Sequence, residues 1–396
     1  MKVLQINTVY KKGSTGKIAK GISDLCKRTE IECKTAYRYC ESGSLGDDEI
    51  VASTWFDCHA HNRLARYTRL GGCFSYFTTR RFLKKVKTFS PDVIHLHNLH
   101  GNFVNLPLLF SYIRKNDVRL IWTLHDCWAF TGQCPHFMFE KCDKWKTECK
   151  KCPLYAANTS AVRYMHKMKR KWFTGLKNVT IVTPSQWLAN LTQESFLKEY
   201  PVKVINNGID LSIFKPTPSD FRKKYKCEDK FLVLGVAFDW GIRKGLDVFI
   251  ELAKRLDDNY QIVLVGTNDE IDKQLPNSII SIHRTQNQTE LAEIYTAADL
   301  FVNPTREDNY PTVNMESIAC GTPVLTFRTG GSPEMIGESC GSVVEYNDIG
   351  ALEKEIKRIC TEKPYSVDAC LNHAKRFDMY ERFEEYIKLY LETKNK

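Results

Sequence analysis

A stretch near the end of the chain, residues 298–334, most constrains the fold. It begins with an apolar run, Ala298–Asn303, that is short enough for a strand buried on both faces. A proline interrupts the run, an acidic loop and a helical pattern follow, and Gly321 marks the end of the helix. A second apolar run starts at Pro323. This order predicts a strand, a loop, a helix and a second parallel strand, which is the repeating unit of an α/β sheet.

Three acids follow the first strand of this stretch. Glu307 and Asp308 lie in the loop, and Glu316 lies in the early turns of the helix. The spacing of Asp308 and Glu316 would allow a loop carboxylate and a helix carboxylate to contact one ligand. Loops at the carboxyl ends of strands are where open α/β sheets bind nucleotides and phosphates. The spacing alone also fits an ordinary connection with surface acids.

Each half of the chain begins with a strand, a glycine-bearing loop and a helix, in that order. After the strand at 2–7, the loop holds Gly13 and Gly16 among basic residues. After the strand at 231–238, Arg243 and Lys244 lie between glycines. A guanidinium, an ammonium and backbone amides at a helix start neutralise a diphosphate. A plain turn, or a solvated Arg-Lys pair, is the alternative in each case.

Histidines end two further apolar runs. The run at 92–97 contains His95 and ends at His97, and the alternation of a strand predicts that both point to one face. The run at 120–124 is followed by His125 and an aspartate. Parallel strands carry their carboxyl ends at one edge of a sheet, so we expect these histidines to meet there and to serve chemistry or binding.

A cysteine cluster follows directly in the segment 127–153. Its spacing is C-x7-C-x6-C-x2-C, formed by Cys134, Cys142, Cys149 and Cys152. The closing C-x2-C is the spacing of a zinc knuckle, and four thiolates complete a tetrahedral structural zinc site. Two disulfides or four free thiols are the alternatives. Most of the other cysteines lie in apolar contexts, which is typical of a reducing compartment.

The segment 63–88 is strongly basic and aromatic. It holds eight Lys and Arg residues and no acid, interleaved with aromatic residues. This composition favours contact with an anionic membrane surface or a lipid-linked acceptor, and a solvated helix face with aromatics in the core is the alternative. Nucleic acid fits the composition less well, and no nucleic-acid partner is expected.

Length and charge indicate two domains. The 396 residues suffice for two cores, and the formal charge of +10 divides into +16 for residues 1–200 and −6 for the rest. No apolar run reaches the roughly 18 residues of a membrane span, and the first apolar run is too short for a signal peptide. We therefore expect a cytoplasmic protein.

Together these motifs resemble the retaining glycosyltransferases of family 4, which have the GT-B fold. The resemblance rests on the acid-x7-Glu pattern at Asp308 and Glu316 followed by Ala-Cys-Gly-Thr-Pro-Val, on Arg-Lys-Gly at 243–245, and on Thr-x-His-Asp ending at Asp126. It spans nearly the whole chain. Both acids of the family pattern are usually Glu, so Glu307 is a second candidate for the first acid.

The resemblance implies a role for each candidate residue. The implied catalytic set is His125, Glu307, Asp308 and Glu316. The residues implied to bind the donor diphosphate are Arg243, Lys244 and Gly16. Those implied to bind the sugar or nucleotide of the donor are Asn309, Tyr310, Pro311 and Glu316, and those on the acceptor side are His97 and Gly13.

The implied fold is GT-B, in which two doubly wound parallel-sheet domains face a central cleft. The expected domains are 1–214, with the cysteine-rich insert at 127–153, and 215–375, which opens with a proline-bearing linker at 215–220. Residues 376–396 are expected to form a terminal helix that crosses back to the first domain.

The implied activity is a retaining glycosyltransferase of the hexosyltransferase type (EC 2.4). The expected donor is a nucleotide-diphosphate sugar, specifically a UDP-sugar, and the acceptor is a lipid-linked or polysaccharide glycan of a bacterial surface, reached on the inner face of the cell membrane. No catalytic metal is expected, because the sequence has no Asp-x-Asp. The alternatives are a GT-B hydrolase or epimerase of nucleotide sugars and a non-catalytic membrane-associated binding protein.

Overall fold

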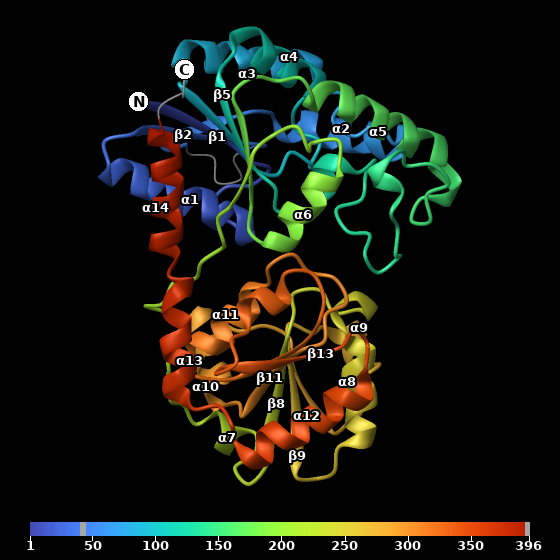
Figure 1. Ribbon diagram of the computed structural model, residues 1–396, viewed down its shortest axis with the longest axis vertical. Helices are drawn as coiled ribbons and strands as arrows, with labels where there is room; N and C mark the ends of the chain where they lie inside the picture. The colour runs from blue at the N-terminus through green and yellow to red at the C-terminus, as the bar shows by residue number, and fades with distance from the viewer. Residues whose placement is uncertain (40–44, 393–396) are drawn as a thin grey trace. The chain divides into compact units, whose positions relative to one another are not determined.

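The chain forms two compact units (Figure 1). The computed structural model describes residues 1–39 and 45–392. Unit 1 contains Met1–Asn206 and the C-terminal segment that begins at Tyr380, and unit 2 contains Asn207–Met379. The first limit, at Asn206, lies eight residues before the expected boundary at 214, and the second, at Met379, lies four residues after the expected boundary at 375.

Among the described residues, unit 1 is built on a seven-stranded parallel sheet with the order β3-β2-β1-β4-β5-β6-β7. Its strands are β1 (Lys2–Ile6), β2 (Glu32–Tyr37), β3 (Glu49–Val51), β4 (Val93–Leu96), β5 (Arg119–Thr123), β6 (Val179–Thr183) and β7 (Val202–Val204). The chain builds outward from β1 to β3 and then returns to the other side of β1 with β4. The strand order therefore reverses between β1 and β4.

Helices cover both faces of this sheet. They are α1 (Gly13–Arg28), α2 (Trp55–Thr68), α3 (Tyr76–Phe89), α4 (Leu106–Asn116), α5 (Thr159–Phe173), α6 (Gln186–Glu194) and α14 (Met379–Leu391). On one face, Leu4 and Ile6 of β1 join an apolar core with residues of α2 to α5, such as Phe82 and Phe110. On the other face, Gln5 of β1 contacts α1, and β4 contacts α14.

Unit 2 repeats the architecture with a six-stranded parallel sheet in the described chain, in the order β10-β9-β8-β11-β12-β13. The strands are β8 (Phe231–Val236), β9 (Tyr260–Val265), β10 (Ile279–Ile282), β11 (Leu300–Asn303), β12 (Val324–Phe327) and β13 (Gly341–Val344). The helices are α7 (Phe221–Lys224), α8 (Leu246–Arg255), α9 (Asp269–Asp272), α10 (Gln288–Ala297), α11 (Thr312–Ala319), α12 (Ile349–Glu362) and α13 (Val367–Ala374). Here the order reverses between β8 and β11, so both sheets are doubly wound, as predicted.

The terminal helix α14 packs against unit 1, beside α1 (Figure 1). The two helices approach so closely that a Cβ atom on Gly21 would lie 2.1 Å from the ring of Phe383. At the end of α14, the Arg119 guanidinium donates to the carbonyl oxygens of Leu389 (2.6 Å) and Tyr390 (2.8 Å). These carbonyls are among the last four of the helix, which have no partner within it. One arginine of β5 therefore caps the helix and ties it to the sheet.

The substitution Arg119→Met tests this attachment. It keeps the aliphatic stem and removes the donors, leaving partly buried carbonyls without them, so we expect the free energy of unfolding to fall by about 1–3 kcal/mol. Urea unfolding followed by tryptophan fluorescence measures the change. The matched control is Lys388→Met, which removes an exposed positive charge from α14 itself. Equal stability of the two variants would contradict the capping role.

Candidate active site

In unit 1 the loops that follow β1 and β4 meet at the carboxyl edge of the sheet. The backbone N–H of Thr8 donates to the carbonyl oxygen of Asn98 (3.0 Å), and its hydroxyl donates to the carbonyl oxygen of His100 (2.7 Å). The side-chain oxygen of Asn7 accepts from the backbone N–H of Asn98 (3.2 Å). Because the strand order reverses between β1 and β4, these loops border the place where α/β sheets bind ligands.

Gly16 lets α1 begin close beneath the loop after β1. The backbone N–H of Lys11 donates to the carbonyl oxygen of Gly16 (3.2 Å), and a Cβ atom at Gly16 would lie 3.3 Å from backbone atoms of Tyr10 and Lys11. Gly13, the first residue of α1, has φ of +63°, which glycine adopts without strain. Both glycines thus shape the backbone here, and their contacts with donor and acceptor stay predictions.

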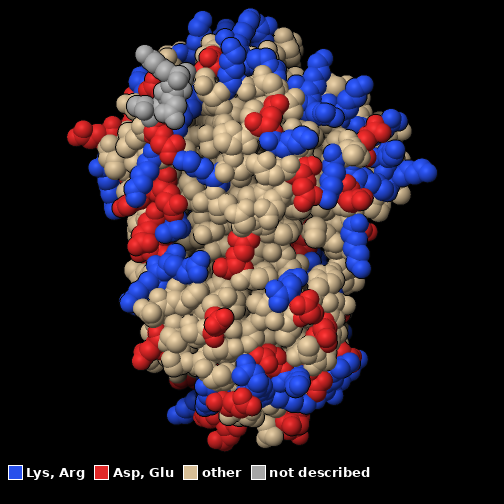
Figure 2. Space-filling view, viewed as in Figure 1, with Lys and Arg blue, Asp and Glu red and all other residues tan. Residues whose placement is uncertain are grey.

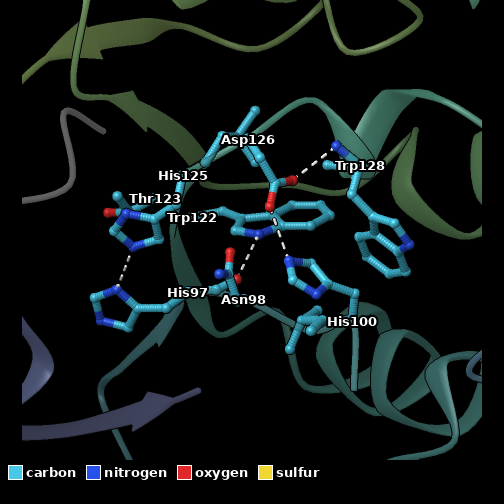
Figure 3. A pocket seen from close by; sticks show the side chains of 11 residues that line it. His97, Asn98, His100, Trp122, Thr123, His125, Asp126 and Trp128 are labelled. Carbon is cyan, nitrogen blue, oxygen red and sulfur yellow. Dashed lines mark hydrogen bonds and ion pairs between the residues drawn. The ribbon is translucent and has the colours of Figure 1, made fainter. Parts of the chain in front are cut away.

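His97 and His125, which follow β4 and β5, lie within hydrogen-bond distance (Figure 3). Nδ1 of His97 is 3.2 Å from Nε2 of His125, and the two rings stack with centroids 5.5 Å apart. The ring of His95 lies on the same side, 4.0 Å from that of His97 between centroids. The predictions that His95 and His97 share a face and that the two strand ends meet are confirmed. What these residues bind stays a prediction.

Gln5 fixes the proton positions in this pair. Its Nε2 donates to the carbonyl oxygen of Ala19 (2.9 Å), so its Oε1 faces Nε2 of His97 (3.0 Å) and accepts a hydrogen from it. When His97 is neutral, its Nδ1 carries no hydrogen and accepts the hydrogen bond that Nε2 of His125 donates. A neutral His125 in this arrangement carries its lone pair on Nδ1.

Burial keeps this histidine cluster uncharged. Loss of solvent lowers the pKa of His125 to about 4, although the carboxylate of Asp126 acts in the opposite direction. Burial, together with the neighbouring rings of His95 and His125, holds the pKa of His97 well below its ordinary value. Burial also lowers the pKa of His95 to about 3. At pH 7 the three rings therefore act as neutral hydrogen-bonding groups rather than as cations.

His100 and Asp126 form a second polar pair beside the first (Figure 3). Nε2 of His100 is 2.8 Å from Oδ2 of Asp126, and Oδ1 of the same carboxylate accepts the backbone N–H of Trp128 (2.8 Å). Burial acts to raise the pKa of Asp126, but the hydrogen bond and charge of His100 outweigh it, so the net shift is downward. Residues of both pairs line one cavity of about 10 Å³. Neither His100 nor Asp126 was among the candidate residues, although both lie in the predicted motifs.

In unit 2 the loop after β11 is held between the loops after β8 and β12, the two neighbours of β11 in the sheet. On the β8 side, the backbone N–H of Arg306 donates to the carbonyl oxygen of Arg243 (2.8 Å). On the β12 side, the backbone N–H of Gly331 donates to the carbonyl oxygen of Asn309 (2.9 Å). These bonds build the carboxyl edge of the sheet at the point where the strand order reverses.

Two glycines make this close approach possible. Gly245 has φ of +79°, and a Cβ atom there would lie 2.5 Å from the carbonyl oxygen of Pro304. Gly330 has φ of +53°, and a Cβ atom there would lie 1.7 Å from the carbonyl oxygen of Asp308. A side chain at either position would displace the loop, so its shape depends on both glycines.

The predicted cations and acids of unit 2 meet in these loops. The ammonium of Lys244 pairs with the carboxylate of Asp308, and the guanidinium of Arg243 donates to the carbonyl oxygen of Glu307 (3.2 Å). Asp308 keeps 21% of its side chain exposed, whereas Glu307 is buried. Of the two candidate acids, Asp308 is therefore the one that can reach a ligand without a change in the loop.

The remaining predicted residues lie along the same segment. Asn309, Tyr310 and Pro311 are buried where the loop enters α11. Glu316, half-buried on α11, accepts a hydrogen bond from the hydroxyl of Tyr295 (3.3 Å). Burial and the nearby carboxylate raise the pKa of Tyr295 well above its usual value, so the hydroxyl remains a donor that orients Glu316.

Arg306 is a supporting residue that the sequence analysis missed. Its guanidinium makes two bonds to the carboxylate of Asp247 (2.6 and 2.7 Å) and one to the side-chain oxygen of Asn347 (2.9 Å). Only 6% of its side chain is exposed. Arg306 thus clamps the loop after β11 to the start of α8. The sequence shows only an arginine beside an acid, which is typical of a solvated surface.

Two doubly wound sheets, each with its polar residues at the point of strand reversal, define a protein of the GT-B type. Residues 218–384 match the family of glycosyl transferases group 1, and residues 39–213 match glycosyltransferase family 4. The chain belongs to these group 1 glycosyl transferases of family 4.

Known proteins resemble the chain in sequence and in fold. WcaC of Escherichia coli K12, assigned to colanic acid biosynthesis as a glycosyl transferase, is 26% identical over 274 residues, covering 66% of each chain. The match thus spans slightly less than two thirds of that relative. The fold is similar to that of sucrose-phosphate synthase from Thermosynechococcus elongatus (TM-score 0.69, 16% identity, 98% of both chains). It is also similar to that of HepE from Anabaena (TM-score 0.66, 16% identity, 98% and 99%). These likenesses confirm the GT-B fold.

The substitution Gln5→Glu tests the hydrogen-bond chain to His125. A carboxylate beside Nε2 of His97 favours the charged ring, so we expect the lowered pKa of His97 to rise toward the neutral range, and the pKa of its partner His125 to rise with it from about 4. In wild type the lowered pKa values cost stability as the pH falls below the ordinary histidine value of about 6.5, because the unfolded chain then binds more protons, and raised values in Gln5→Glu lessen this pH dependence. Histidine-selective NMR titration of both proteins measures the shifts. Gln133→Glu is the control for an added carboxylate elsewhere in unit 1. Identical histidine titrations in wild type and Gln5→Glu would contradict the hydrogen-bond chain from Gln5 to His125.

Proposed function

We propose that this protein transfers a sugar from a nucleotide-diphosphate sugar, specifically a UDP-sugar, to a lipid-linked or polysaccharide acceptor with retention of the anomeric configuration. The observation that carries the proposal is the loop arrangement of unit 2. Arg243 and Lys244 lie beside the acid-bearing loop after β11, at the strand reversal of the sheet. The resemblance to the retaining glycosyltransferases supports the retaining course.

The two cations suit the charge that develops during the reaction. When the bond from the sugar to the diphosphate breaks, negative charge grows on the leaving phosphate oxygen. A guanidinium and an ammonium already held by the loops of unit 2 stabilise that charge with little reorganisation. This chemistry needs no divalent cation bound by an Asp-x-Asp motif, which the sequence lacks.

The acids and the histidine are suited to hydroxyl groups of the donor. Glu316 offers a carboxylate oriented by Tyr295, and we assign it to the ribose hydroxyls. Asp308, as the partly exposed acid of the loop, is assigned to the donor sugar together with the backbone of Asn309 and Tyr310. In unit 1, neutral His125 is assigned to a sugar hydroxyl as a hydrogen-bonding group.

Two related proteins support the choice of donor and pathway. HepE from Anabaena has been crystallised with UDP and glucose and with UDP-glucose. WcaC is assigned to colanic acid biosynthesis. A donor of the UDP-sugar class and a role in bacterial surface-glycan biosynthesis are therefore our working assignments for this chain.

The substitution Arg243→Ala tests the donor site. Loss of a charge-assisted contact with the diphosphate weakens binding of UDP by about tenfold or more. Calorimetric titration of wild type and variant with UDP, GDP and UDP-sugars measures the effect and identifies the nucleotide class.

The matched control for this experiment is Arg255→Ala, which removes an exposed arginine from α8 in the same unit. Binding of GDP in preference to UDP would correct the donor class. Absence of nucleotide binding at millimolar concentration would refute the transferase. Hydrolysis of the donor at full rate without any acceptor would favour the hydrolase alternative.

We further propose that unit 1 docks peripherally on an anionic membrane through α2 and α3. Figure 2 shows Lys and Arg side chains gathered over the helices at the top of unit 1. The exposed basic residues of α2 and α3 are Arg63, Arg66, Arg80, Arg81, Lys84, Lys85 and Lys87. Among the exposed aromatic residues, Phe56 and Phe77 are each 76% exposed and Tyr67 is 89% exposed, whereas Phe82 is buried. Cations beside exposed aromatic rings suit an anionic lipid surface.

The same surface offers a place for a phosphate of a lipid-linked acceptor. A cavity of about 380 Å³ opens between the start of α2 and α3, with Arg81, Lys85 and Phe56 among its lining residues. Within the described chain, no helix is both long and apolar enough to span a bilayer. Docking through this surface is therefore the form of membrane contact that we propose.

The double substitution Arg81→Ser and Lys85→Ser tests the docking surface. Each basic residue near an anionic membrane contributes about 1 kcal/mol, so we expect the partition coefficient onto phosphatidylglycerol vesicles to fall about 30-fold. Flotation with vesicles measures it, and Phe77→Ser probes the aromatic part. The control is Lys254→Ser with Arg255→Ser on unit 2. Equal flotation of wild type and the first variant would contradict docking through α2 and α3.

A further inference from the structure

The cysteine-rich segment after β5 is long and contains little regular structure. From Cys127 to Asn158 the structure shows only three short 3-10 turns, at Trp128–Phe130, Lys144–Lys146 and Ala156–Asn158. Yet the segment is part of the apolar core of unit 1, to which Phe137 and Trp145 belong. Something other than helix or sheet hydrogen bonding must therefore hold these turns in one arrangement.

The four predicted cysteines converge in this segment. Cys134, Cys149 and Cys152 are buried and Cys142 is half-buried. All four line one cavity of about 10 Å³, walled by Phe137, Trp145 and Val162. None of the four is joined in a disulfide. Four thiols thus surround one small space, although they are up to 18 positions apart in sequence.

The turns that carry these cysteines are fixed by bonds to their backbones. The hydroxyl of Thr131 donates to the carbonyl oxygen of Cys134 (2.6 Å), and the indole N–H of Trp145 donates to the carbonyl oxygen of Cys142 (3.0 Å). The backbone N–H of Cys142 donates to the carbonyl oxygen of Phe137 (3.3 Å). With the backbones held this way, the side chains of the cysteines face a common space.

We propose that Cys134, Cys142, Cys149 and Cys152 bind one structural zinc ion as four thiolates. Zinc prefers tetrahedral thiolate coordination with Zn–S bonds of about 2.3 Å, and the closing C-x2-C is a usual zinc spacing. No three of the four sulfur atoms lie within 4.8 Å of one another here, since among the described residues only Asp269, Asp272 and His283 form such a group. Zinc binding therefore draws the four thiolates toward one another. Because four thiolates fill the coordination sphere of the ion, the ion is structural rather than catalytic.

The segment that carries the zinc site also forms part of the wall of the histidine cavity. The buried ammonium of Lys169, on α5, donates to the carbonyl oxygen of Trp128 (2.7 Å), and Trp128 lies beside Asp126 in the wall of that cavity. Cys134 begins the zinc segment only six residues after Trp128. A zinc ion that orders the turns from Cys134 onward therefore supports the cavity wall without touching a substrate.

Metal analysis of the purified full chain tests the proposal. We expect one equivalent of zinc per chain, which Cys149→Ser and Cys152→Ser each reduce to near zero. The control Cys127→Ser, a buried cysteine of the same segment outside the four, retains the metal. A second control, His283→Ala, disrupts the exposed Asp269, Asp272 and His283 group and also retains it.

Measurements on wild type keep the test valid if a cysteine variant does not fold. X-ray absorption at the zinc edge is expected to show four sulfur neighbours at about 2.3 Å. A strong chelator is expected to lower the melting temperature by about 5 °C or more, and added zinc to restore it. Three outcomes would overturn the proposal: no stoichiometric zinc after reconstitution, nitrogen or oxygen neighbours at the metal, or disulfides among the four cysteines. None of these readouts depends on transferase activity.

Discussion

Both parallel sheets are covered on both faces, and this constraint decides where polar chemistry can lie. In β8, Leu232 and Leu234 enter the core shared with α10 and α11, whereas Val233 enters the core shared with α8 and α12. A strand buried on both sides carries apolar residues throughout, because an unpaired polar group there is costly. Charged and polar residues are therefore favoured at the strand ends, and the strand reversals of the two sheets become the places where such residues from different loops meet.

Unit 1 breaks this rule on one face, and the exception shows what supports the histidines. His95 lies within β4, where its Nδ1 is 2.6 Å from the hydroxyl of Tyr390 and its Nε2 is 2.8 Å from the hydroxyl of Thr123. Tyr390 comes from α14, the last helix of the chain. Polar side chains can be buried on the sheet face covered by α1 and α14 because they form hydrogen bonds there. The C-terminal helix is thus part of the framework that holds His95, against whose ring His97 packs.

The two doubly wound parallel sheets and the placement of the candidate residues in loops after strands were predictable, whereas the contacts of those residues were not. Arg243 and Asp308 became candidates because each lies in a loop a few residues after an apolar run and matches the family pattern. Their partners depend on packing between distant segments: Lys244 and Asp308 are 64 residues apart, and Gln5 and His97 are 92 apart. No local pattern distinguishes such a pair from two solvated side chains. Arg306 escaped prediction for the same reason, since only its burial reveals its role.

The loops of unit 2 combine a rigid frame with one adjustable contact. Gly245, Gly330 and the Arg306–Asp247 pair fix the backbone of the loop after β11 through contacts that a ligand need not touch. The Lys244–Asp308 pair differs, because 19% and 21% of these side chains are exposed. In the proposed reaction a diphosphate and Asp308 are anions that compete for one ammonium. The arrival of the donor would therefore weaken this pair and turn the carboxylate toward the sugar hydroxyls, while the rest of the loop keeps its position.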